Sequence, residues 1–287
     1  MKTSIIILTF NNKRFTEACI ESLYKYTPLN DFELILVDNN SNDGSKDWIK
    51  DFASKNSNVK YIINDFNNNF SGGCNQGAAI ATCEYLLFLN NDTILTPNWL
   101  YPMQKCFLND KKIGIVGNVH MFPNTNIVWH CGVVIDVDCS PHHIYFGHTK
   151  NTPMVNKSRE FQVVTGACLM IRKDIFNKVG GFDENYKNSY EDVDLCFKVG
   201  QLGYKVYYCH ESMIYHYGSI SENRKLHDNR NAAILIKKWK KIIKTDRKSY
   251  MRKDNYPYCL FPKYPKDLFM AIKSIVSRLH YRLRNPT

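Results

Sequence analysis

The sequence predicts an α/β protein built around a mostly parallel, doubly wound sheet. Two periodicities alternate along the first hundred residues: short apolar runs that are typical of buried strands, and amphipathic stretches with helical spacing. The connections between them are short, and strands that alternate with helices in this way pair in parallel through right-handed crossovers. At 287 residues the chain is also long enough to bury a substantial core.

The first four predicted strands are short apolar runs. They read SIIILTF at residues 4–10, FELILVD at 32–38, VKYII at 59–63 and YLLFL at 85–89. A helix is predicted over residues 14–26, where apolar side chains recur at helical spacing. A polar turn at 39–44 opens the second helix, and a polar stretch with glycines at 64–77 precedes a short helix over 78–81.

Beyond Pro97 the regular alternation loosens. Strands are predicted at residues 113–119, 133–136 and 161–171, a long loop at 139–158, and helices that begin at 172 and cover 191–203. From residue 231 a basic helix, a proline-interrupted segment and a final helix follow. We therefore expect a body at residues 1–230, with halves at 1–100 and 101–230, and a basic helical extension at 231–287.

The composition excludes several classes of protein. Hydrophobic residues make up 44% of the chain and aromatic residues 13%, which excludes a disordered chain, and no apolar run is long enough to cross a bilayer. The first residues lead straight into a strand-like run without a secretory cleavage site, so we expect a cytoplasmic protein. The ten cysteines are scattered singly, which suits reduced thiols better than disulfides or zinc.

The net charge of +11 lies in the extension. Residues 231–287 hold 15 Lys and Arg against 3 Asp and Glu, so the body is close to neutral. A neutral body argues against nucleic-acid binding, which would place a basic stripe on the folded surface. The final apolar stripe, flanked by basic residues between 266 and 284, suits an anionic membrane interface, although such a stripe can equally dock on the body or on a twin subunit.

Polar side chains follow the predicted strands where each one ends. Thr9, Asp38, Asn64 and the pair Asn91–Asp92 all fall at carboxyl ends, and ligands of doubly wound sheets bind at that edge. Taken alone, Asp92 suits a helix cap as well as a ligand site. One carboxylate is nevertheless enough for a divalent cation whose other positions are filled by water and substrate phosphate.

Six segments together resemble a known family. They read SIIILTFNN, LILVDNNSNDGS, NNFSGGCNQGAAIA, YLLFLNNDT, VTGACLMIRKDIFNKVGGFDENY and YEDVDLCFKVGQLGYKVYYCHESMIYHYGS. Their order and spacing over residues 3–219 are similar to those of family-2 inverting glycosyltransferases with the GT-A fold, especially the bacterial rhamnosyl- and galactosyl-type enzymes of surface polysaccharides. The resemblance implies a GT-A catalytic domain at 1–230, with a nucleotide-sugar half at 1–100 and an acceptor half at 101–230.

The resemblance also implies a donor site and a metal. The residues expected at the nucleotide sugar are Thr9, Asn11, Asp38, Asn40, Gly73, Asn75 and Asn91. Asp38 suits an Asx-turn as well, and the two roles are compatible. Asp92 matches the last carboxylate of the family's D-x-D motif, and His216 matches the late histidine that completes the metal site. An imidazole ligand favours Mn²⁺ over Mg²⁺.

The resemblance places the general base at Asp192, with Glu191 as the second candidate. Acidic residues at the start of a helix also interact favourably with its dipole, so this pair suits a purely structural role too. The base takes the proton from the acceptor hydroxyl as that oxygen attacks the anomeric carbon. Trp129 and His130 offer a stacking surface for a sugar or a contribution to the core, and His142, His143 and His148 suggest a surface or acceptor-side loop.

The expected function is metal-dependent inverting transfer of a sugar from a nucleotide-diphosphate donor, UDP- or dTDP-linked, to a lipid-linked surface glycan. The expected partners are the nucleotide sugar, a glycan or glycolipid acceptor, the inner face of the cytoplasmic membrane and a second copy of the chain. Two alternatives stay open: a protein O-glycosyltransferase and a non-catalytic sugar-nucleotide-binding scaffold. An NAD-dependent enzyme is disfavoured because no G-x-G-x-x-G follows the first strand.

Overall fold

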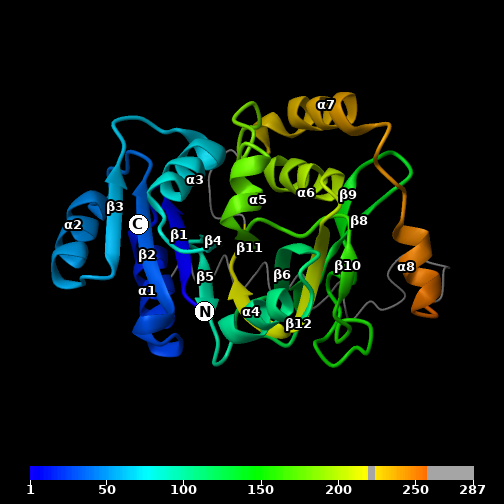
Figure 1. Cartoon of the computed structure of the whole chain (residues 1–287), viewed down its shortest axis with the longest axis horizontal. Helices are drawn as coiled ribbons and strands as arrows, with labels where there is room; N and C mark the ends of the chain where they lie inside the picture. The colour runs from blue at the N-terminus through cyan, green and yellow to red at the C-terminus, as the bar shows by residue number, and fades with distance from the viewer. Residues whose placement is uncertain (219–223, 257–287) are drawn as a thin grey trace.

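The computed structural model describes residues 1–218 and 224–256 (Figure 1). The helices in these ranges are α1 (Lys13–Tyr26), α2 (Ser45–Lys55), α3 (Asn69–Ile80), α4 (Leu100–Asn109), α5 (Lys173–Lys178), α6 (Glu191–Gln201), α7 (Asp228–Trp239) and α8 (Arg247–Lys253). The strands are β1 (Thr3–Thr9), β2 (Phe32–Asp38), β3 (Val59–Ile63), β4 (Tyr85–Asn90), β5 (Thr93–Leu95), β6 (Ile113–Met121), β7 (Val128–His130), β8 (Val133–Ile135), β9 (Pro141–His143), β10 (Arg159–Phe161), β11 (Cys168–Arg172) and β12 (Lys205–His216). The predicted final helix lies outside the described residues.

The central sheet of the described chain runs in the order β10-β12-β6-β11-β4-β1-β2-β3, with β5 beside β12 and β7 beside β6. β3, β2, β1 and β4 are all parallel, which confirms the four strands and the doubly wound half predicted from the sequence. Register places Thr9 opposite Asp38 and Leu8 opposite Asn90. The polar strand ends therefore share one edge, and the helices cover the two faces of the sheet (Figure 1).

The other half of the sheet is mixed. β11 is antiparallel to both β4 and β6, whereas β12 is parallel to β6. The prediction of one strand over 161–171 is wrong, because β10 ends at Phe161 and β11 begins at Cys168. The strand β5 was not predicted: it follows Asp92 directly and pairs with β12, so that Thr93 faces His216. This pairing brings the end of β12 to the end of β4.

The glycine-rich stretch before residue 78 is helical, so the predicted loop at this place is wrong. A β-carbon on Gly73 would lie 2.3 Å from Leu8 Cδ1, and one on Gly77 would lie 2.6 Å from Ile6 Cγ2. The glycines therefore let α3 lie close against β1, which is a packing role that sequence periodicity alone does not reveal. Whether Gly73 also contacts a ligand stays a prediction.

The helices α7 and α8 lie against the body. The predicted boundary after residue 230 falls inside α7, and Leu235 and Trp239 of this helix belong to the main hydrophobic core. Beyond α8, Asp254 forms an ion pair with Arg159 at 2.7 Å. Figure 1 shows α7 beside α6, and α8 at the end of the molecule opposite α2. Across the described residues we find no helix with the length and apolar character needed to span a bilayer.

Candidate active site

The candidate site begins where β1 and β2 end. The backbone N–H of Asn39 donates to Thr9 O at 2.8 Å, and that of Asn64 donates to Asp38 O at 2.9 Å, so the chain turns at the same level on three neighbouring strands. The amide of Asn39 accepts from Asn64 Nδ2 at 3.0 Å, which in turn donates to Gln76 Oε1 at 2.8 Å. Sequence analysis missed this amide cluster, because its members give no motif of their own.

Asp38 is fully buried at this edge. Its Oδ1 accepts from the backbone N–H of Ser41 at 2.9 Å, which is the expected Asx-turn. Its Oδ2 is buried as well and has no hydrogen-bond partner among the described residues. A buried carboxylate oxygen without a donor is costly, so this atom is suited to accept a hydrogen bond from a ligand.

Asn11 and Asn40 shape the loops that follow β1 and β2. Both have left-handed backbone, with φ of 56° and 70° respectively. The backbone N–H of Asn11 donates to Ser41 Oγ at 2.8 Å, and Asn11 Oδ1 accepts from the backbone of Asn42 at 2.9 Å. Asn40 Oδ1 accepts from Lys46 Nζ at 2.5 Å. The two asparagines thus hold the loops together around the edge of the sheet.

Contacts continue from β1 to the end of β4 and on to α6. Asn91 Nδ2 donates to Thr16 Oγ1 at 3.0 Å and lies 3.4 Å from Thr9 Oγ1. The backbone N–H of Asn90 donates to Ala167 O at 2.9 Å. The backbone N–H of Gly166, the residue before Ala167, donates to Asp192 Oδ2 at 2.8 Å. The predicted nucleotide positions and the predicted base are therefore connected through the end of β4.

Asp92 and His216 face each other beside this path. Asp92 Oδ1 lies 3.2 Å from His216 Nε2, and the two residues are only 4% and 2% exposed. Burial raises the pKa of the Asp92 carboxyl, but the charge of His216 beside it outweighs burial and holds the pKa below its ordinary value. His216 Nε2 is buried as well, and Asp92 is the partner that the described residues place beside it.

A cluster of buried rings surrounds His216. The ring centroid of Trp129 lies 4.6 Å from that of His216, and the centroid of His120 lies 5.3 Å away. His120 and His130 are fully buried, and burial lowers the pKa of each well below the ordinary imidazole value, helped by their imidazole neighbours. Trp129 and His130 thus pack inside the protein, which agrees with the second of their two expected roles, a contribution to the core.

Glu191 and Asp192 form the first turn of α6. Glu191 is 7% exposed, whereas Asp192 is half-buried and therefore more accessible. Asp192 Oδ1 accepts from the backbone N–H of Val193 at 2.8 Å, in addition to the contact of Oδ2 with Gly166. A β-carbon on Gly166 would lie 3.0 Å from Asp192 Cβ, so a glycine suits this close approach.

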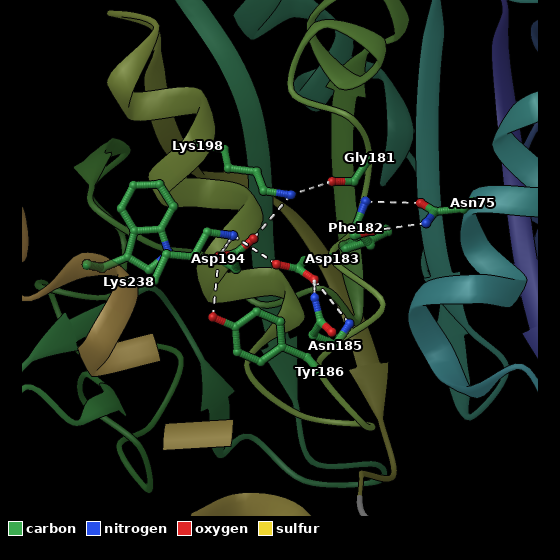
Figure 2. A network of polar contacts seen from close by, with 10 residues as sticks. Asn75, Gly181, Phe182, Asp183, Asn185, Tyr186, Asp194, Lys198 and Lys238 are labelled. Carbon is green, nitrogen blue, oxygen red and sulfur yellow. Dashed lines mark hydrogen bonds and ion pairs between the residues drawn. The ribbon is translucent and has the colours of Figure 1, made fainter. Parts of the chain in front are cut away.

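Asp194 holds α6 in place (Figure 2). Its carboxylate is fully buried and accepts a hydrogen bond from Trp239 Nε1 at 2.7 Å. Lys238 Nζ lies 2.8 Å away and Lys198 Nζ 3.2 Å away. Sequence analysis gave this residue no role. The structure shows that it ties the helix of the predicted base to α7.

Asn75 fastens α3 to the loop at 181–185 (Figure 2). Its amide donates to Phe182 O and to Glu184 Oε1, both at 3.0 Å, and accepts from the backbone N–H of Phe182 at 3.0 Å. The same loop accepts from Lys198 through Gly181 O at 3.0 Å. The side chain of Asn75 is thus engaged within the protein, and its contact with a donor stays a prediction.

A metal ion at this edge would need ligands from outside the protein. Within residues 1–218 and 224–256, no cluster of three or more His, Cys, Asp or Glu side chains is arranged to hold a metal ion. Asp92 and His216 supply two ligand atoms, a carboxylate oxygen and an imidazole nitrogen, which are buried and already 3.2 Å apart. This pair fits Mn²⁺ or Mg²⁺ only where substrate and water complete the coordination.

Comparison with known proteins gives consistent results. Residues 4–180 match the family described as Glycosyl transferase family 2. An uncharacterized protein of Sinorhizobium fredii, y4gI, is 31% identical over 225 residues, which cover 76% of this chain. The O-antigen biosynthesis protein RfbC of Myxococcus xanthus is 29% identical over 237 residues, or 77% of this chain. The matched regions span only 24% and 18% of these two longer relatives.

The fold is shared with solved structures at low sequence identity. GalNAc-T7, determined with UDP, GalNAc and Mn²⁺, superposes with a TM-score of 0.68 at 16% identity, and the match covers 88% of this chain and 55% of that one. At a sequence identity this low, the comparison supports a shared fold and nothing more. The curled, mostly parallel sheet flanked by helices is thus the fold that the sequence predicted for the catalytic body.

Proposed function

The chain belongs to glycosyl transferase family 2, and on this premise we propose that it transfers a sugar from a nucleotide-diphosphate donor to a hydroxyl group of a surface glycan. One observation carries the proposal. An unbroken set of contacts runs from Asp38 through Thr9 and Asn91 to the end of β4, and from there to Asp192. A donor-binding carboxylate and a base are thereby held at one edge of the sheet.

The nucleotide binds at the ends of β1 and β2 in this proposal. Asp38 Oδ2 accepts a hydrogen bond from the base or the ribose, because it is buried and lacks a donor within the described residues. The loops held by Asn11 and Asn40 flank this atom. The UDP and Mn²⁺ in the GalNAc-T7 structure support a nucleotide of this kind, with UDP or dTDP as our choice of donor.

Asp192 acts as the general base. Its carboxylate takes the proton from the acceptor hydroxyl while that oxygen attacks the anomeric carbon from the side opposite the leaving diphosphate, which inverts the configuration. The backbone N–H groups of Gly166 and Val193 orient the carboxylate, because each donates a hydrogen bond to one of its two oxygens. Glu191 is the second candidate, but its deeper burial leaves it less accessible to an acceptor.

Asp92 and His216 hold the metal ion in this proposal. A bound Mn²⁺ or Mg²⁺ would neutralise charge on the departing diphosphate. The two side chains meet the ligand chemistry of such an ion, an oxygen and a neutral nitrogen 3.2 Å apart in a buried place. The diphosphate and water complete its coordination, so a protein cluster of three ligands is not required.

The acceptor is a growing surface glycan, carried on a lipid. The O-antigen role in the name of RfbC supports a polysaccharide product. A protein acceptor is the second candidate, since the same base and donor site would serve a Ser or Thr hydroxyl. A non-catalytic scaffold is the third, but it gives no reason for an oriented, accessible carboxylate at Asp192.

The surface of α7 and α8 suits the inner face of a membrane. The basic side chains exposed between residues 237 and 253 include Lys237, Lys240, Lys241, Lys244 and Lys253. The one acidic residue of this stretch, Asp246, accepts from the backbone of Ile135 at 2.8 Å, and Asp254, the next residue after the stretch, pairs with Arg159. Each exposed lysine near an anionic bilayer contributes about 1 kcal/mol of attraction.

A flotation assay with vesicles that contain acidic phospholipid tests the membrane contact. Changing Lys240, Lys241 and Lys244 to Gln should lower the bound fraction. The same charge change at Lys2, Lys50 and Lys55, which are exposed elsewhere on the body, serves as the control. Equal binding by both triple variants would remove the segment between α7 and α8 as the contact.

A donor screen tests the proposed activity. Each nucleotide sugar is added with Mn²⁺, and the melting temperature and the release of nucleoside diphosphate are measured with glycolipid and protein acceptors. We expect one donor to raise the melting temperature and a glycolipid to accelerate release. A mass increase on protein acceptors alone would favour the second candidate, and donor binding without any transfer would favour the scaffold.

A further inference from the structure

We propose that His120 is a positioning residue that holds a proton on His216 Nδ1, so that Nε2, the nitrogen beside Asp92, is the atom left to bind the metal ion. The inference rests on the proposed metal site and adds a residue outside every motif that pointed to it. His120 lies on β6, is fully buried, and places its Nδ1 3.4 Å from His216 Nδ1.

The direction of each hydrogen bond follows from a fixed starting point. Ser212 donates its only hydroxyl proton to the backbone oxygen of Trp99. Ser212 Oγ therefore accepts from Asn118 Nδ2, at 3.0 Å. This contact orients the Asn118 amide, because its nitrogen is held by Ser212 and its Oδ1 must then face the other way. Asn118 Oδ1 lies 3.0 Å from His120 Nε2.

The orientation of Asn118 determines which ring nitrogen donates a hydrogen bond in His120 and in His216. An amide oxygen only accepts, so His120 Nε2 carries the proton. A neutral His120 then has a lone pair on Nδ1, which faces His216 Nδ1. His216 Nδ1 must therefore carry a proton and donate it, so that a neutral His216 has its lone pair on Nε2. The hydrogen bonds that begin at Ser212 thus determine which nitrogen of His216 donates to His120.

The nitrogen left for a metal ion is the one beside Asp92. His216 Nε2 and Asp92 Oδ1 are 3.2 Å apart, and both residues are almost fully buried. In the absence of a metal ion, a proton on Nε2 pairs it with the Asp92 carboxylate, and a divalent cation bound by both atoms takes the place of this proton. If the proton of a neutral His216 lay on Nε2 instead of Nδ1, metal binding would first require a change of tautomer. His120 therefore keeps Nε2 available for the metal ion.

Paired variants at position 120 test the role. His120→Leu removes the acceptor, whereas the side-chain oxygen of His120→Gln can accept from His216 Nδ1. His130→Leu is the matched control: it removes an equally buried imidazole whose ring centroid is 5.1 Å from that of His120, but His130 bonds to His143. Binding of Mn²⁺ with UDP is measured by electron paramagnetic resonance on the full chain.

We expect His120→Leu to weaken Mn²⁺ binding about 10- to 100-fold, the range typical of lost outer-shell partners of metal ligands. His120→Gln and His130→Leu should stay within a few-fold of the unaltered protein. Equal affinity of His120→Leu and the unaltered protein would overturn the proposal. So would equal losses in His120→Leu and His130→Leu, which would indicate general disruption of the core.

A second measurement needs neither metal nor variant. The ¹⁵N chemical shifts of His216 at pH 9, without metal, should show a protonated Nδ1. An unprotonated Nδ1 would overturn the proposal even if Mn²⁺ binds. Because this readout requires no donor or acceptor, it separates an incorrect role for His120 from an incorrect function for the protein, which the donor screen tests.

Discussion

Trp239 on α7 donates a 2.7 Å hydrogen bond from its indole Nε1 to Asp194 on α6, the helix that begins with Glu191 and Asp192. The accepting carboxylate is fully buried and also pairs with Lys198 and Lys238. The helix of the predicted base and the first helix of the predicted extension are therefore joined through one charged group.

Asp194→Asn should destabilise the fold by about 3 kcal/mol, because it leaves two lysines beside a neutral amide where a buried charge was paired. The free energy of unfolding in urea measures the change. Asp174→Asn is the control, since Asp174 pairs with Arg172 at 2.7 Å but is 61% exposed, and the expected change there is below about 1 kcal/mol. Equal changes in both variants would contradict the anchoring role of Asp194.

Asp192→Asn should lower sugar transfer by about 10²- to 10⁴-fold, the usual contribution of a general base. An amide keeps the size of the side chain but has a single acceptor oxygen, so it keeps only one of the two contacts with the backbone N–H groups of Gly166 and Val193. The melting temperature should therefore fall slightly, whereas the affinity for nucleotide with Mn²⁺ should stay unchanged. Steady-state transfer and calorimetric binding provide the two readouts. If Glu191→Gln causes the loss and Asp192→Asn does not, the base is Glu191.

Asp92→Asn should abolish metal-dependent transfer, because the carboxylate is the only charged ligand of the proposed pair. Asn91→Ala should only weaken it, since Asn91 brings no charge and its loss leaves the hydroxyls of Thr9 and Thr16 bonded to each other at 3.0 Å. Transfer is measured across a series of Mn²⁺ concentrations. Full activity of Asp92→Asn at saturating Mn²⁺ would contradict the assignment.

Glu33 should make the fold sensitive to acid. Burial raises the pKa of its carboxyl, but hydrogen bonds from Ser4, Thr82 and Lys60 outweigh burial and lower the pKa to about 2. The folded pKa lies below the ordinary value of 4.5, so this carboxylate stabilises the protein fully above pH 4.5 and loses that contribution as the pH falls towards 2.

The pH dependence of Glu33→Gln tests this. The difference in free energy of unfolding between the unaltered protein and the variant should be largest above pH 5 and should shrink steadily towards pH 2.5. Glu33 is 5% exposed and bonds to both Ser4 and Thr82, so the variant should also be less stable at neutral pH. A difference that does not vary with pH would show that the carboxylate is not the source.

The sequence predicts the parallel half of the fold well because its signals are local. β1 and β2 are apolar runs of seven residues that end in polar residues, and the structure begins and ends them within a residue of the prediction. The helix α3 was misplaced because glycines usually interrupt helices, whereas Gly73 and Gly77 are needed here for contact with β1. That reason is visible only once the sheet is in place.

The residues of the candidate site also fall into two groups, those that sequence signals point to and those that they do not. Asp38, Asp92, Asp192 and His216 could be found from strand ends and family motifs. Asp194 and His120 could not, because their roles depend on partners far away in the chain: Trp239 is 45 residues from Asp194, and His216 is 96 residues from His120. Neither residue stands in a spacing that predicts such a contact.

Because Leu235 and Trp239 lie in the main core, they also limit where the folded chain can be cut. A chain cut after residue 230 would keep Asp192 but lose the indole that bonds to Asp194, and would open the core beneath α6. A junction that leaves the core intact must therefore lie beyond Trp239, and a transplanted α6 requires α7 to be moved with it.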